Sequence, residues 1–177
     1  MRILILSLPL LALTACMPPV NRTPLPPLSV AAIEPARYLG KWYEIARLPN
    51  QFENDCEGVT AEYGARADGK ISVINTCHSG GPGGAPRQAK GSARIVDAAS
   101  NAKLKVSFFG PFEGDYWVLD HAPDYSWSIV GEPRGRYLWI LSRTAQIAPA
   151  LRADLIERVR ARGYSVDALH WTQQAPA

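Results

Sequence analysis

The residues of this 177-residue chain that could perform chemistry are three cysteines and three histidines. His78, His121 and His170 lie in separate segments, and no Cys, Asp or Glu stands at a spacing from them that predicts a metal site. The sequence contains no G-x-S-x-G or comparable nucleophile turn. We therefore expect a protein that is not an enzyme and that uses neither a metal nor a cofactor.

The first cysteine follows a short apolar leader. Arg2 supplies a positive charge, residues 3–13 are almost entirely apolar, and the run closes with Leu13-Thr14-Ala15-Cys16. About ten apolar residues are too few to cross a hydrocarbon core of about 30 Å. The end of the leader resembles the lipobox of bacterial lipoprotein signals, which implies cleavage before Cys16 and acylation of that cysteine. In such lipoproteins Asp after the cysteine retains the protein in the inner membrane, so Met17 implies the outer membrane. The alternative is an ordinary signal peptide with a chance cysteine.

The other two cysteines are expected to pair. If Cys16 is acylated, Cys56 and Cys77 remain in an oxidising compartment. They flank Ala67-Asp68-Gly69, whose Asp-Gly pair is a strong hairpin signal, with alternating apolar residues on both sides. Antiparallel pairing about this turn brings the two cysteines nearly opposite each other. A reactive thiol is the alternative, but a paired cysteine is not a nucleophile.

Composition divides the chain into three parts. Residues 1–15 form the leader, and residues 16–35 form a tether with six prolines after Cys16, which favours an extended spacer. Residues 36–175 suit one domain with a core of its own. The formal charge of +3 falls to +2 when Arg2 leaves with the leader, and the basic residues are scattered, so we expect no nucleic-acid partner.

The sequence of the domain predicts short β-strands separated by turn residues. Their spacing indicates an all-β sandwich or barrel. The short connections make each strand pair with its sequence neighbour, and eight such strands remove their exposed edges by closing into an up-and-down antiparallel β-barrel. The eight expected strands are 41–47, 57–65, 70–77, 87–96, 103–109, 115–121, 125–132 and 137–143.

One helix and a short strand follow the barrel. Pro149 suits the first turn of the helix and Gly163 its end. Its apolar stripe, Leu151, Leu155, Ile156 and Val159, is expected to pack outside the barrel, and lying on a membrane is the alternative. The final strand is expected at residues 169–173.

Three motifs resemble one family. Residues 40–47, GKWYEIAR, resemble the first lipocalin signature, G-x-W-Y-E-I-A. Residues 137–143, YLWILSR, resemble the third signature, which ends the eighth strand in an arginine. Residues 105–112 are similar to bacterial outer-membrane lipoprotein lipocalins, often called Blc-type. The second signature, a Thr-Asp-Tyr group between strands six and seven, is poorly kept at residues 120–125.

The first and third signatures imply a contact. Closure of the barrel brings the first and eighth strands side by side, so Arg143 can lie over the indole of Trp42. A desolvated cation–π contact contributes on the order of 2 kcal/mol. We expect this pair to plug the closed end of the barrel and to be structural.

The same alternation assigns an inner face to three strands. With Arg143 inward, every second residue before it also points inward. On the sixth strand Tyr116 and Val118 are preferred over Trp117 and Leu119, and the small residues Gly91 and Ala93 on the fourth strand are expected to leave space. The resulting apolar cup is typical of a small-molecule site, although the same side chains could simply fill a core. The expected ligand-binding residues are Leu104, Val106, Phe108, Tyr116, Val118, Tyr137, Trp139 and Leu141.

The resemblance implies a fatty acid or a lysophospholipid as ligand, for lipid storage or transport in envelope maintenance. We expect the protein to be attached to the membrane through acylated Cys16. The sequence leaves open whether the protein forms a homodimer. The alternatives are a structural envelope lipoprotein with a filled barrel, or a carrier of another small hydrophobic ligand. A haem carrier is disfavoured because no histidine falls on a clearly inward strand position.

Overall fold

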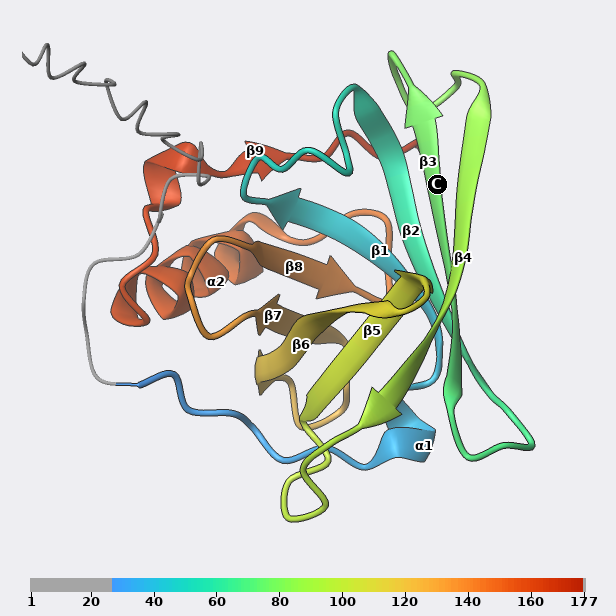
Figure 1. The fold of residues 1–177 in the computed structure, drawn as a ribbon. Helices are drawn as coiled ribbons and strands as arrows, with labels where there is room; N and C mark the ends of the chain where they lie inside the picture. Colours follow the sequence, from blue (N-terminus) through green and yellow to red (C-terminus); the bar gives the residue numbers. More distant parts are fainter. Residues whose placement is uncertain (1–26, 177) are drawn as a thin grey trace, which may run out of the picture.

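The computed structural model describes residues 27–176, so the leader and Cys16 lie outside the described residues. The described chain folds into one antiparallel barrel with a helix against its wall (Figure 1). The elements are α1 (Pro35–Tyr38), β1 (Gly40–Arg47), β2 (Cys56–Ala65), β3 (Ile71–Ser79), β4 (Pro86–Ile95), β5 (Lys103–Phe109), β6 (Phe112–His121), β7 (Trp127–Gly131), β8 (Leu138–Ser142), α2 (Pro149–Ala161), η1 (Val166–Ala168) and β9 (His170–Trp171).

The predicted eight-stranded up-and-down barrel is confirmed. Strands β2 to β8 pair in sequence order, and β1 pairs with both β8 and β2, which closes the sheet. Tyr43 shows this closure directly, because it is opposite Thr60 on one side and Ser142 on the other. The added strand β9 pairs with β1 at the end where β1 and β2 separate. Closure satisfies backbone groups that would otherwise be exposed at sheet edges.

Alternation along the strands separates two cores. Inward side chains such as Leu104 and Val118 meet inside the barrel. Outward side chains such as Leu119 and Ile140 pack with α2, whose Leu155 and Val159 are fully buried. The apolar stripe of the helix therefore packs on the barrel wall.

The segment before α1 belongs to the folded unit. The Ala31 amide donates to the Val118 carbonyl at 3.0 Å, and the Ile33 amide donates to the Ser100 carbonyl at 2.9 Å. The Ile33 side chain is buried. The packed unit thus starts earlier than residue 36, because apolar residues of the proline-rich segment bind to the barrel. Sequence reasoning also missed α1 and η1, and the last strand is shorter than expected.

The predicted disulfide is confirmed. Cys56 and Cys77 are bonded, with their Cα atoms 5.3 Å apart and a sequence separation of 21. In the chain-entropy model a loop of this size contributes about 3 kcal/mol. The bond joins β2 to β3 at the end of the barrel opposite α1.

Arg143 ties the α1 end together. Its guanidinium carbon lies 3.8 Å from the ring centroid of the fully buried Trp42. The same guanidinium donates to the carbonyls of Arg37 (2.8 Å), Leu39 (2.9 Å) and Lys41 (2.8 Å). The Trp42 indole donates to the Tyr38 carbonyl at 2.9 Å. One arginine thus joins β8 to the turn that links α1 to β1.

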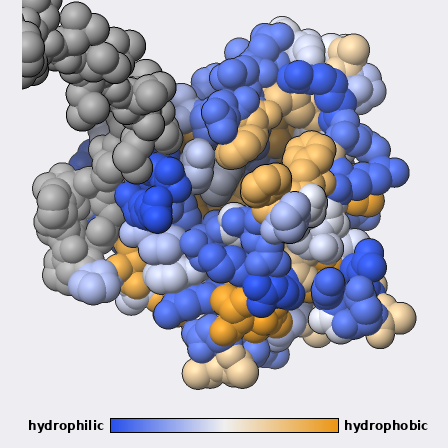
Figure 2. Space-filling view, viewed as in Figure 1, coloured by the Kyte–Doolittle hydropathy of each residue, from blue (hydrophilic) through white to orange (hydrophobic). Residues whose placement is uncertain are grey.

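The opposite end carries the β1–β2, β3–β4, β5–β6 and β7–β8 connections, because the strand direction alternates around a meander. Three phenylalanines on these connections are largely exposed: Phe52 (66%), Phe109 (80%) and Phe112 (78%). Figure 2 shows apolar surface beside the β5–β6 hairpin, with hydrophilic surface around it. We call this end of the barrel the mouth.

Replacing Arg143 with leucine is expected to lower the free energy of unfolding by about 2–4 kcal/mol, because three carbonyls lose a charged donor and Trp42 loses its cation. Urea denaturation followed by fluorescence measures the change.

The matched control is Arg152→Leu, since the Arg152 guanidinium carbon lies 3.6 Å from the Trp171 ring centroid on the exterior. We expect a smaller loss there, about 0.5–1 kcal/mol, typical of an exposed cation–π pair. Equal losses in the two variants would mean that the carbonyl contacts of Arg143 add nothing.

Candidate ligand-binding site

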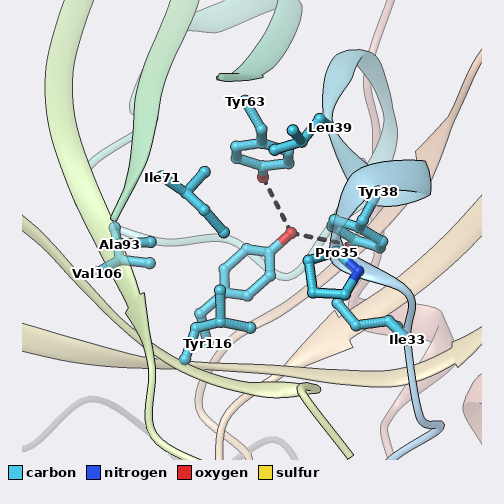
Figure 3. A pocket seen from close by; sticks show the side chains of 10 residues that line it. Ile33, Pro35, Tyr38, Leu39, Tyr63, Ile71, Ala93, Val106 and Tyr116 are labelled. Carbon is cyan, nitrogen blue, oxygen red and sulfur yellow. Dashed lines mark hydrogen bonds between the residues drawn. The ribbon is translucent and has the colours of Figure 1, made fainter. Parts of the chain in front are cut away.

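An apolar cavity lies inside the barrel, next to α1. It is bordered by the segment that enters α1 and by inward side chains of β2 to β6 (Figure 3). Its lining carries no formal charge. The lining residues are Ile33, Pro35, Tyr38, Leu39, Tyr63, Ile71, Ala93, Leu104, Val106 and Tyr116.

Three tyrosine hydroxyls meet in the cavity. The Tyr116 oxygen lies 2.9 Å from that of Tyr63 and 3.2 Å from that of Tyr38, as the dashed lines of Figure 3 show. The Tyr38 hydroxyl also lies 2.9 Å from the Ser128 hydroxyl, which donates to the Asp120 carbonyl at 3.3 Å. The three phenols thus satisfy one another among the apolar side chains of the cavity.

Burial keeps these phenols neutral. Desolvation raises the pKa of Tyr38 from 10.0 to about 12, against the lowering effect of the Ser128 hydrogen bond. Desolvation likewise raises the pKa of Tyr63, where Tyr38 adds to the increase and the Tyr116 hydrogen bond opposes it. It also raises the pKa of Tyr116, to which both neighbouring tyrosines add. The cavity therefore offers hydroxyl groups and apolar surface, but no charge that would pair with an ionic headgroup.

The free space is small in this structure. About 20 Å³ is open to the centre of a water molecule, and roughly 10–15 Å³ is enough for one water. Pockets for drug-sized ligands commonly measure about 300–1,000 Å³. A ligand of that size therefore fits only if side chains that line the cavity move.

The structure places the eight expected ligand residues at different depths. Leu104, Val106 and Tyr116 line the cavity. Val118 and Leu141 are buried in the same interior core, against which Phe108 and Trp139 pack while partly exposed.

Tyr137 precedes β8 and lies outside this core. Its ring stacks on Trp139 with 5.9 Å between centroids, and it lies 5.8 Å from the Phe52 ring at the mouth.

One expectation about open space is wrong. The small Gly91 is expected to leave space for a ligand, yet a Cβ there would clash with the Ser107 backbone oxygen and lie 2.8 Å from Cδ1 of Phe108. The glycine makes room for the backbone of β5 and for the Phe108 ring. Ala93 does border the cavity.

Sequence reasoning missed Tyr38 and Tyr63. Tyr63 had a usable signal, since it lies two positions from the inward Ala61 within a predicted strand. Tyr38 had none, because it lies on a four-residue helix whose position depends on the packing of the chain across the barrel end.

A buried charged cluster joins the mouth to the barrel wall. Arg47 Nη1 donates to Glu44 Oε1 at 2.7 Å, and Arg47 Nε lies 3.7 Å from Glu53 Oε2. Burial and the Glu53 charge raise the pKa of Glu44, against the opposing effect of Arg47. The Trp139 indole and the Asn50 amide both donate to Glu53 Oε2, at 3.0 and 2.6 Å. Glu53 thus fastens the β1–β2 loop to the inner wall.

A second hollow, of about 370 Å³, lies outside the interior core, between this loop and the chain around β9. It is lined mainly by polar residues: Arg47, Pro49, Asn50, Glu53, Asn54, Asp55, Cys56, Glu57, Gly80, His170 and Gln173. Two of its three carboxylates, Glu53 and Glu57, already bind groups of the protein, and His170 Nε2 lies 2.8 Å from Glu57 Oε1. This hollow lacks the apolar wall that an acyl chain needs.

The histidines remain apart in space. His78 contacts the Gly58 carbonyl, and His121 contacts the carbonyls of Ala32 and Ala122. Within residues 27–176 no three His, Cys, Asp or Glu side chains gather where they could hold a metal ion. In the same part of the chain, no helix has the length and apolar character needed to cross a bilayer.

Two of the solved structures that share the fold are similar to this chain over most of its length. The allergen Per a 4 from cockroaches has a TM-score of 0.65 at 19% identity, covering 88% of this chain and 96% of its own. Insecticyanin from the tobacco hornworm Manduca sexta has a TM-score of 0.63 at 23% identity, covering 89% of this chain and 86% of its own. At these identities the likeness shows the fold alone.

Sequence comparison is more specific. The outer membrane lipoprotein Blc of Vibrio cholerae is 42% identical over 146 residues, which are 82% of this chain and 85% of that protein. Blc of Escherichia coli K12 is 40% identical over 155 residues, which are 86% of this chain and 87% of that protein. The temperature-induced lipocalin-1 of Arabidopsis thaliana is 40% identical, covering 82% of each chain. The family model of the lipocalin-like domain matches residues 33–174. The chain belongs to the lipocalin family, in the group that includes the Blc lipoproteins.

Proposed function

We propose that this lipocalin binds the acyl chain of a fatty acid or lysophospholipid inside its barrel and does not convert it chemically. The observation that carries the proposal is the uncharged lining of the cavity, in which the polar groups are neutral phenols. Apolar burial of about ten methylenes at about 0.8 kcal/mol each is a large gross gain, which the entropy cost of association reduces. The charged headgroup would remain near the mouth, where the polar side chains lie.

Entry of the acyl chain would require rearrangement of the tyrosines. Tyr116 is the middle member of the hydroxyl chain, and its ring borders the free space together with Leu104 and Val106. Rotation of this ring would break two hydrogen bonds, each worth about 1 kcal/mol net. This cost is small compared with the gain from a buried acyl chain, so the compact cavity is compatible with lipid binding.

We also propose attachment to the outer membrane through acylated Cys16. The leader with its closing cysteine supports this, as do two relatives named outer membrane lipoprotein Blc. Together with the cavity, this location favours lipid storage or transport in envelope maintenance.

A structural lipoprotein with a filled barrel is the second candidate. The specific observation in its favour is the small free volume, with Phe108 in the space beside Gly91. Another small hydrophobic ligand is a third candidate, and titration distinguishes the three.

Lipid binding is tested with a chain that starts at residue 16, carries Cys16→Ala and has been delipidated. We expect a saturable change in tryptophan fluorescence at low micromolar fatty acid or lysophospholipid, and loss of this change in Trp139→Ala because Trp139 packs on the interior core.

Trp171→Ala is the matched control, since this tryptophan lies on β9 beneath Arg152 on the exterior. No response to any lipid would favour the filled barrel, and a response to other apolar compounds alone would favour a different ligand.

Tyr116→Leu tests whether the acyl chain uses the space of the tyrosine cluster. The variant should be less stable, by about 1–3 kcal/mol, because the Tyr38 and Tyr63 hydroxyls lose a buried partner. It should nevertheless bind fatty acid several-fold more tightly, since no hydroxyl chain has to open. Thermal denaturation measures the stability of the variant, and the fluorescence titration measures its affinity for fatty acid. Unchanged or weaker affinity would place the ligand elsewhere.

Cys16→Ser in the full-length chain tests the anchor. The wild-type chain should incorporate labelled palmitate and sediment with outer membranes, whereas the variant should do neither because it lacks the thiol that is acylated. Membrane fractionation after labelling measures both properties. Label in the variant would contradict the assignment of Cys16.

A further inference from the structure

We propose that the mouth of the barrel docks on the surface of a phospholipid bilayer, with Phe52, Phe109 and Phe112 inserted among the lipids. Among residues 27–176, these are three of the four large apolar side chains that are strongly exposed. They come from two separate connections, the β1–β2 loop and the β5–β6 hairpin, that topology brings to the same end. Large apolar side chains that stay exposed at one end of a folded protein favour an interaction at that end.

Side-chain contacts hold the β1–β2 loop, whereas strand pairing holds the β5–β6 hairpin. Phe52 follows Asn50, whose side chain accepts from the Phe52 amide and donates to Glu53, so the buried charged cluster fixes the base of this loop. Phe109 and Phe112 face each other across the hairpin. The exposed rings therefore project from backbone that is held in place by hydrogen bonds.

Charge at the mouth suits phospholipid phosphates. Arg87 lies at the start of β4 and Arg134 on the β7–β8 connection, both exposed, and the half-buried Arg136 follows on the same connection. No salt bridge joins these arginines to a carboxylate within the described part of the chain. The nearby Glu132 is buried and accepts from the backbone amides of Arg134 and Arg136. The exposed carboxylate of Asp55 on the β1–β2 loop opposes the charges of these arginines. The two exposed arginines outnumber it and favour an anionic membrane surface.

A second copy of the chain fits this surface less well. Three phenylalanine side chains supply roughly 600 Å² in total, whereas a stable interface needs about 800 Å² on each partner. A two-fold contact would also bring the arginines of both copies together.

The attachment point allows this orientation. The chain joins the barrel where Ala31 bonds to Val118, about 20 Å along β6 from Phe112 at roughly 3.3 Å per residue. The ten residues 17–26 can span about 30 Å when extended. Cys16 and the mouth can therefore reach the same bilayer.

Vesicle flotation tests the docking without the acyl anchor. The chain that starts at residue 16 with Cys16→Ala retains every described residue, and the vesicles contain phosphatidylethanolamine and phosphatidylglycerol at 3:1. We expect binding, and we expect the variant Phe52→Ser/Phe109→Ser/Phe112→Ser to bind at least about tenfold more weakly, since burial of even one phenylalanine changes affinity by about that factor.

The matched control is Val96→Ser, which removes the fourth exposed apolar side chain, at the α1 end of the barrel. Retained binding in this variant, with loss in the triple variant, supports the proposal. Equal binding by wild type and triple variant, or an equal loss in Val96→Ser, overturns it. A wild-type dimer in light scattering that the triple variant abolishes, without vesicle binding, would also overturn it and make the mouth an interface between copies. Fatty-acid titration of the triple variant reports on the cavity separately, so docking and lipid binding can fail independently.

Discussion

Closure of the sheet by β1 is the constraint on which the rest of this structure depends. Because β1 pairs with both β2 and β8, alternate residues of every strand must point into a single enclosed space. Arg143 secures the same junction from β8, through Trp42 and three backbone carbonyls of the α1–β1 turn. A barrel left open at this seam would expose strand edges and its apolar interior together.

Closure also determines the chemistry of the interior. Polar groups enclosed in a barrel must find partners inside it, and the three phenols do so by bonding to one another and to Ser128. Their neutrality leaves an apolar space without a charge that could pair with an ionic group. The charged side chains Glu44, Arg47 and Glu53 are instead joined near the mouth, where they fasten the β1–β2 loop.

The two ends of the barrel consequently have different properties. At the α1 end, aromatic and apolar side chains are packed and capped by Arg143. At the mouth, anchored loops expose phenylalanines and arginines. This polarity suits a protein that would exchange lipid with a bilayer through one end while the other end stays closed, which unites the proposed ligand with the proposed docking surface.

The sequence by itself determined the strands, their order and their faces, because period-two alternation and turn residues are local signals. It also indicated the Cys56–Cys77 pair, since both cysteines flank one hairpin. Only the tertiary structure decided how full the barrel is. Phe108 occupies the space beside Gly91, and Tyr38 reaches the cavity from a four-residue helix, through contacts between segments far apart in the chain. Volume and hydroxyl pairing depend on such contacts, which no local pattern encodes.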